Sequence, residues 1–264
     1  MSAPYNSVAG ESRSTQLLKS NKRCVQCDLR YESFAGLDLS GADLTGAYLF
    51  DTNFSKCLLT ASSFESAILI NARLQSADLT RANLSKASLQ DANLRGASLQ
   101  KANLTFTNFN GAVLEAAELS EANLTTATMV GVLMNDVFAI DAILRGTDMR
   151  RGDLRRGNFT GADLEGANLS GANLSGAKLS ATSMRNTKLV GADLTDATLD
   201  FANLRNSNLH KAKLVGAKLN GANLGNADLS GADLTNAEMG SVFDENTNYC
   251  DAKMPDGSKG LCKK

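Results

Sequence analysis

The sequence lacks several features that would point to a common class of protein. It has no run of 18 apolar residues, which predicts no membrane-spanning helix, and residues 1–20 contain no apolar segment of the kind found in secretion signals. The net charge of −1 excludes, as a global property, both a strongly basic nucleic-acid-wrapping protein and a strongly acidic rod. His210 is the only histidine of the 264 residues, so little material for acid–base or metal chemistry is present.

What the sequence has is a repeat of five residues. In residues 161–180 the unit reads Ala, Asp or Asn, Leu, a polar residue and Gly, and stepping by five from Leu164 reaches Leu29 and Met239 without an insertion or deletion. This spans 43 units, because (239−29)/5+1 = 43. The central residue is Leu in 32 units, Phe or Met in ten and Ala in one, Ala139. A short fixed period predicts a solenoid in which each copy buries its large side chain against its neighbours.

The period excludes the two regular secondary structures. In a helix, an apolar residue at every fifth position steps about 500° and spreads over all faces. In a long strand, a step of five changes the face each time. The chain must therefore bend once per unit. Of the 22 glycines, 15 lie two residues after a centre, which indicates corners that favour a positive φ.

Units such as Ala-Asp-Leu-Thr-Gly and Ala-Asn-Leu-Ser-Gly resemble those of the pentapeptide-repeat proteins, over about 215 residues. The resemblance implies an all-β fold, a right-handed quadrilateral parallel β-helix with four pentapeptides per 20-residue coil. It further implies about eleven coils and, at about 4.8 Å per strand, a rod roughly 50 Å long. The stretch 24–243 is expected to form this β-helix, after a disordered leader and short capping helix in 1–23 and before a capping hairpin or tail in 244–264.

Both ends of a solenoid need covers, because they expose unpaired strand edges. Ser14 to Ser20 is predicted to be helical, with Leu17 and Leu18 covering the first coil. At the other end, Pro255-Asp-Gly predicts a turn that folds the tail back over the last coil.

The five cysteines leave alternatives open. Cys24 and Cys27 both fall at inward positions, which suits buried side chains, a disulfide or, least well, half a zinc site, since no further ligands lie nearby. Cys250 and Cys262 flank the predicted turn and could form a disulfide. Similar Cys-containing lead-ins and Met-Pro-Asp-Gly tails occur in the cyanobacterial and plastid branch of the family. Oxidised pairs would imply the thylakoid lumen or periplasm, and reduced ones the cytoplasm.

One coil departs from the repeat. Val132 and Val137 replace the small residue before the centre, and Gly152 and Gly157 stand 20 residues later, so the implied coil predicts that each gain in volume is matched by a loss directly above it. Ala139 is matched in the same way by Phe159.

The same region supplies the main candidate for a partner surface, an apolar belt beside an arginine belt. Its members are Val130, Leu133, Phe138, Ile140, Ile143, Arg145, Arg150, Arg151, Arg155 and Arg156. The competing interpretation is that Asp136, Asp148 and Asp153 neutralise the arginines while the apolar residues wrap several walls. A secondary apolar patch is expected where Tyr48 stacks with Ile68 and Phe50 with Ile70, against the alternative of scattered surface residues.

No catalytic residues, metal or cofactor follow from the sequence, because the repeat already accounts for His210 and the protein is not expected to be an enzyme. The first hypothesis is a partner-binding scaffold or regulatory rod, with an unknown protein partner, no direct nucleic-acid binding, and a monomeric or weakly end-to-end dimeric state. The alternative, implied by the family, is a mimic of duplex DNA that inhibits or protects DNA gyrase. It fits poorly, because such mimicry needs a continuous anionic surface.

Overall fold

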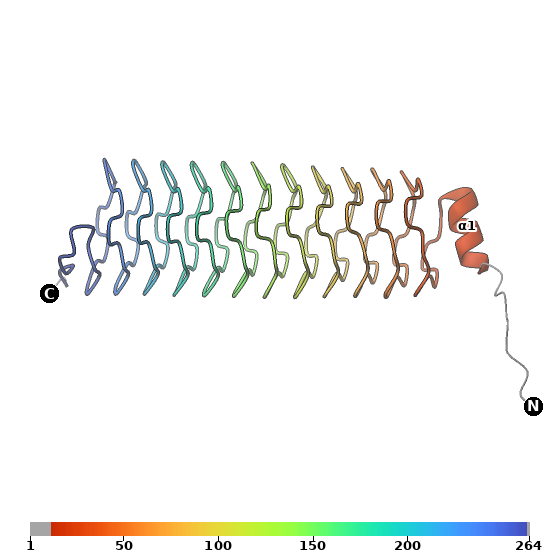
Figure 1. The fold of residues 1–264 in the computed structure, drawn as a ribbon, viewed down its shortest axis with the longest axis horizontal. Helices are drawn as coiled ribbons and strands as arrows, with labels where there is room; N and C mark the ends of the chain where they lie inside the picture. Colours follow the sequence, from red (N-terminus) through yellow and green to blue (C-terminus); the bar gives the residue numbers. More distant parts are fainter. Residues whose placement is uncertain (1–11, 263–264) are drawn as a thin grey trace, which may run out of the picture.

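The molecule is a straight rod with one helix at its N-terminal end (Figure 1). The computed structural model describes residues 12–262, so the first part of the predicted disordered leader lies outside the described residues. The helix, α1, spans Arg13–Asn21, and the rest of the rod is built from single parallel bridges rather than extended strands. In the described range α1 is the one helix, and its nine residues are too few to cross a membrane.

Every parallel bridge joins two residues that are 20 positions apart, from Arg23 with Asp43 to Asp233 with Lys253. Four pentapeptides therefore complete one coil of a β-helix. The bridges form four ladders, which we call walls. The first bridges are Arg23 with Asp43 on wall 1, Asp28 with Tyr48 on wall 2, Ser33 with Asn53 on wall 3 and Asp38 with Leu58 on wall 4.

The chain turns from one wall to the next at the position two residues after each centre. There the backbone is left-handed, as at Gly161 with φ of 71°, and non-glycine residues adopt the same conformation, as at Phe201 with φ of 59°. The prediction of a positive φ at the corners is confirmed. Asp and Asn before the centres support the turns: Asn123 Oδ1, for example, accepts a hydrogen bond from the backbone N–H of Thr125 at 3.0 Å.

The core is a continuous column of leucine, with alanine lining it. Leu164, Leu174 and the other repeat leucines between the ends are buried almost completely, and so are the alanines two residues before them. The rings of Phe34 and Phe54 stack one coil apart with centroids 5.3 Å apart. Because each leucine contacts the coils above and below, the hydrophobic effect acts along the whole length of the rod.

The N-terminal end is closed by α1. The side chain of Ser12 caps the helix by accepting from the N–H of Thr15, and Leu18 is fully buried against the first coil. Leu17 was predicted to share this role, but that prediction is wrong. It precedes Leu18 by one position, about 100° around the helix, and points to solvent with 39% of its surface exposed.

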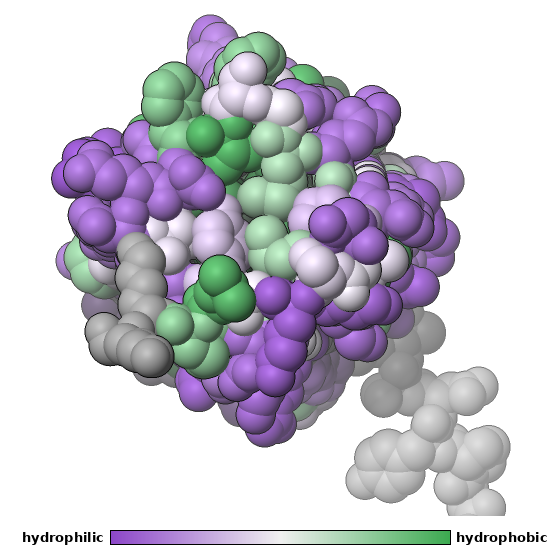
Figure 2. Space-filling model, turned by 90° about the vertical axis from the view of Figure 1, so that its left-hand side faces the viewer, coloured by the Kyte–Doolittle hydropathy of each residue, from purple (hydrophilic) through white to green (hydrophobic). Residues whose placement is uncertain are grey.

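The C-terminal end is closed by a short reversal of the chain, in which Lys253 pairs antiparallel with Lys259. Apolar side chains remain visible across this end of the rod (Figure 2). At this end, Tyr249, Met254 and Leu261 border a hollow of about 710 Å³. The covering of the last coil is thus looser than that of the first.

The cysteines form two disulfides, one near each end of the rod. Cys24 is bonded to Cys27, and Cys250 is bonded to Cys262 across the C-terminal reversal. Cys57 is free and buried, with its Sγ 2.8 Å from the carbonyl oxygen of Phe34. Cys24 is both buried and disulfide-bonded, so burial and a disulfide, which the sequence left open as alternatives, do not exclude each other.

Candidate functional site

The predicted belt encircles the rod instead of gathering on one side. Leu133 lies on wall 3, Phe138 on wall 4 and Ile143 on wall 1, because successive pentapeptides occupy successive walls. All three are exposed, and Phe138 keeps 48% of its surface accessible. Ile140 is exposed beside Phe138 on wall 4, so the largest apolar area of the belt is on that wall.

Four of the five belt arginines are held by carboxylates. Arg150 pairs with Asp148 at 2.7 Å, Arg155 with Asp153 at 2.6 Å, Arg156 with Asp136 at 2.7 Å, and Arg145 with Asp163.

These ion pairs favour the charged form of each acid. Hydrogen bonds from Arg156 lower the pKa of Asp136 to about 2, and those from Arg150 lower the pKa of Asp148. The competing interpretation from the sequence, partial neutralisation around several walls, therefore describes this region better than a basic patch does.

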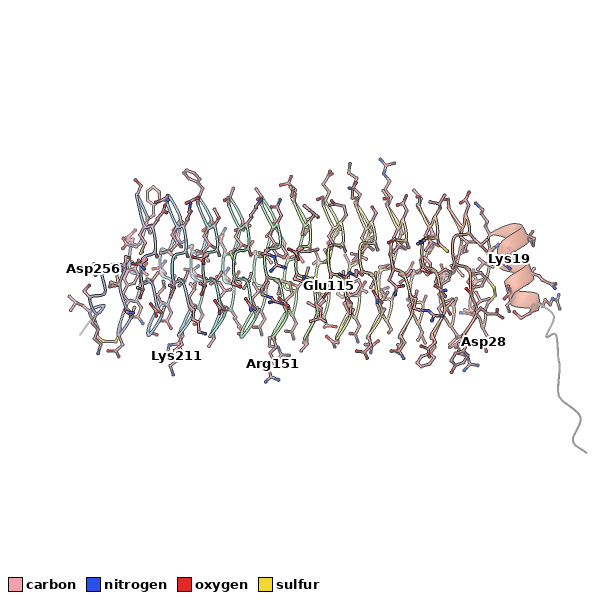
Figure 3. All side chains as sticks on the ribbon, viewed as in Figure 1. Lys19, Asp28, Glu115, Arg151, Lys211 and Asp256 are labelled. Atoms are coloured by element: carbon pink, nitrogen blue, oxygen red, sulfur yellow. A yellow bond between two sulfur atoms is a disulfide. The ribbon has the colours of Figure 1, made fainter. Side chains whose placement is uncertain are left out.

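Arg151 differs from the other belt arginines. It lies at the corner between walls 2 and 3, its side chain points away from the rod (Figure 3), and the described residues provide no ion pair for it. Beside it, Val130, Arg150, Ser170 and Gly171 line a hollow of about 410 Å³. The belt is thus uneven. Its exposed apolar side chains are spread over three walls, and its one arginine without an ion pair in the described range lies at this corner.

The secondary patch is stacked as predicted but is small. Tyr48 and Ile68 form a bridge on wall 2, and Tyr48 is 49% exposed, whereas Phe50, Ile68 and Ile70 are half-buried. The ring of Phe50 packs edge-to-face on Tyr31, with centroids 5.7 Å apart. Much of the apolar surface of this patch is therefore already covered by the chain itself.

A surface that the sequence analysis missed lies on wall 1 near the C-terminal end. Phe201 is 74% exposed at the corner leading into this wall, and Phe243 is 67% exposed on its ladder. Between them, Gly225 leaves a hollow of about 490 Å³ next to Arg205. The signal that could have revealed it is the position of Gly225, which is one residue after a centre and thus not at a corner.

The remaining polar clusters are explained by the stacking of coils and by the disulfide. His210 Nδ1 lies 2.8 Å from Ser230 Oγ, so a serine does face the histidine, but the two are 20 residues apart on one wall. Donor atoms of Cys250, Asp251 and Cys262 lie within 4.8 Å of one another. Since the two sulfur atoms are bonded to each other, they do not offer thiolates to a metal.

Comparison with protein families finds two matching models. The pentapeptide repeat region model matches residues 47–124, and the model for pentapeptide repeats (8 copies) matches residues 23–55, 139–171, 172–210 and 212–242. Among curated proteins, no sequence matches the chain.

Solved structures of related proteins also match. HetL, a pentapeptide repeat protein involved in heterocyst differentiation regulation in the cyanobacterium Nostoc, is 30% identical over 94% of this chain and 97% of its own, with a TM-score of 0.42. A pentapeptide repeat protein from the thylakoid lumen of Arabidopsis thaliana is 29% identical over 45% of this chain and 66% of its own, with a TM-score of 0.20. QnrB1, a plasmid-mediated fluoroquinolone resistance protein, is 17% identical over 84% and 91%, with a TM-score of 0.46.

Proposed function

The chain belongs to the pentapeptide-repeat family, and we propose that it is a non-enzymatic, right-handed quadrilateral β-helix that binds protein partners on its walls. We further propose about eleven coils over residues 24–243, between a leader with a capping helix in 1–23 and a capping tail in 244–264. Repeat rods suit this task because each coil presents side chains at fixed spacing on a surface whose fold does not depend on them.

One observation supports binding at the belt more than any other. Four large apolar side chains of a single coil are exposed: Leu133, Phe138, Ile140 and Ile143. The core beneath them is complete without them, since Met134, Val137, Ala139 and Leu144 are fully buried. Phe138 and Ile140 share wall 4, and adjacent exposed apolar groups mark contact sites more often than isolated ones do.

The test is capture of partners from an extract of the host cells by the immobilised protein. Phe138→Asp places a charge in the centre of the wall 4 area and should abolish capture without unfolding the rod, because Phe138 is half exposed. Thr198→Asp is the matched control, since residue 198 has the same place on wall 4 three coils away. If Phe138→Asp captures the same proteins as the unchanged chain, the belt is not the site.

Mimicry of duplex DNA remains the alternative hypothesis, and the surface gives it little support. The five arginines of the belt lie among the acidic side chains, so the surface is not continuously anionic, and the net charge is −1. A supercoiling assay with DNA gyrase distinguishes the two functions. Inhibition or protection at micromolar protein would favour the mimic over the scaffold.

A further inference from the structure

One position on wall 1 lacks the side chain that its row otherwise carries. The row consists of residues two positions after each bridge residue, and near the C-terminal end it runs Arg185, Arg205, Gly225, Glu245. At Gly225 the wall is hollowed, and Asn223, Asn226 and Phe243 line the hollow with the neighbours above and below. We call this hollow the wall 1 notch.

The backbone does not require glycine at this position. Corner glycines of the repeat have a positive φ, but Gly225 does not lie in the left-handed region. Five coils earlier, Thr125 occupies the same place, donating its N–H and hydroxyl to Oδ1 of Asn123. Asn223 makes the same bond to the N–H of Gly225 at 3.0 Å. A Cβ on residue 225 would lie 3.2 Å from Oδ1 of Asn223, so a threonine fits after a small shift of that side chain, as Thr125 does beside Asn123. Its absence opens a space without serving the fold.

The charges around the notch are arranged in order along the rod. Arg205 forms its lower edge, and Arg185 lies one coil below; within residues 12–262 neither has an ion pair. Asp244 and Glu245 form the upper edge. The two unpaired arginines attract carboxylates, whereas the acidic upper edge repels a long polyanion such as a nucleic-acid backbone.

Apolar surface flanks the notch on two sides. Phe243 lines it directly, together with Val242. Phe201 lies one corner away, and its ring covers Gly221 so closely that a Cβ there would be 2.7 Å from Cδ1 of Phe201. These are the two most exposed of the phenylalanines, and aromatic residues beside arginine are the usual centre of a protein–protein contact.

We propose that the wall 1 notch binds an extended acidic peptide segment of a protein partner. A carboxylate of the segment pairs with Arg205 and Arg185, and an apolar side chain two residues away enters the space above Gly225 beside Phe243. In an extended peptide, the side chains of residues i and i+2 point to the same side and lie about 7 Å apart. One coil of the rod is about 5 Å from the next and two coils span about 10 Å, so the peptide distance lies between these two spacings. This inference rests on the proposed function, the binding of protein partners, but uses a surface separate from the belt.

The test begins with a displayed library of heptapeptides selected on the full chain. We expect enriched peptides to carry Asp or Glu two positions from an aromatic or aliphatic residue. Binding of the enriched peptides is then measured by fluorescence polarisation for Gly225→Thr, which fills the notch, and for Arg205→Gln, which removes the charge. Each change should weaken binding about tenfold or more. Added salt should weaken it as well, because the arginines are exposed.

Two controls separate this site from the rest of the rod. Arg73→Gln removes an exposed arginine without an ion pair from wall 3 and should leave peptide binding unchanged. Phe138→Asp damages the belt and should also leave it unchanged, so failure of the belt and failure of the notch give different results. The proposal is overturned if no acidic peptides are enriched, or if the enriched peptides bind Gly225→Thr as tightly as the unchanged protein. Circular dichroism of Gly225→Thr should show an intact fold.

Discussion

Val137 occupies the space that a methyl group on Gly157 would need. A Cβ built on Gly157 would lie 3.1 Å from Cγ1 of Val137, one coil below it, and 2.6 Å from Cε2 of Phe159 in the same coil. A Cβ on Gly152 would likewise lie 3.2 Å from Cγ1 of Val132, one coil below, and 2.9 Å from Cδ1 of Leu154. The extra volume of each valine is therefore balanced by a glycine one coil later in the stack, as the sequence predicted. The interior conserves its volume locally, from one coil to the next.

This relationship predicts a coupled pair of substitutions. Gly157→Ala should destabilise the rod by about 1–3 kcal/mol, because the methyl group overfills the core. Combined with Val137→Ala, it should cost less than the sum of the single changes by about 0.5–3 kcal/mol. Equilibrium unfolding in urea measures both. The matched pair of Gly157→Ala with Val132→Ala joins positions that are not stacked and should be nearly additive; equal coupling in both pairs would contradict local compensation.

The repeat made the fold readable from sequence, because the same contacts recur in every coil. A buried residue at each centre follows from the period, and the glycines two residues later mark the corners; Leu164 and Gly161 behave as predicted. Features that occur once in the chain, without a recurring pattern, were harder to predict. Gly225 is one of the seven glycines that do not lie two residues after a centre, and its place in the stack was not considered, so the notch went unnoticed. The direction of Leu17 depends on where α1 meets the first coil, which no period encodes.

The column of buried leucines predicts that shortening one leucine side chain strongly destabilises the rod. Leu174 is fully buried between neighbouring coils, so Leu174→Ala should leave a cavity and lower the free energy of unfolding by about 2–5 kcal/mol. Chemical denaturation followed by circular dichroism measures the loss. Ser175→Ala, at the adjacent outward position, should change stability little. A small effect of Leu174→Ala would mean that the coils close around the missing volume.

The disulfides predict the thiol count of the native protein. Mass spectrometry after alkylation in denaturant should find one free cysteine, Cys57, because the other four are paired. Without denaturant Cys57 should react slowly, since burial shields it and raises the pKa of its thiol. One free thiol would also support the thylakoid lumen or periplasm. Five free thiols in protein isolated from its host would contradict both expectations.

The belt ion pairs predict that the stability of the rod falls at acid pH. The pKa of Asp136 is lowered to about 2 by hydrogen bonds from Arg156, so its carboxylate is more acidic in the folded rod than in the unfolded chain. The pair therefore stabilises the fold above the unfolded value of about 3.9, and this contribution is lost as the pH falls toward 2. NMR titration of Asp136 should show the low value in the unchanged protein and a rise toward the normal value in Arg156→Gln. An unchanged titration would mean that Arg156 does not hold this carboxylate.

The C-terminal disulfide predicts a local rather than a global change in stability. Cys262 is tied to Cys250, and this bond holds the reversal in which Gly260 N–H donates to the carbonyl of Ala252 at 2.7 Å. Because coils contact only their neighbours, Cys262→Ser should speed amide hydrogen exchange in residues 251–262 and leave the coils around Leu174 unchanged. Exchange measured by mass spectrometry tests this, and a reducing agent should reproduce the effect in the unchanged protein. Cys27→Ser is the matched control, because its effect should be confined to α1 and the first coil. Faster exchange throughout the rod would show that the terminal cover stabilises every coil, and no change at all would show that the reversal holds without the bond.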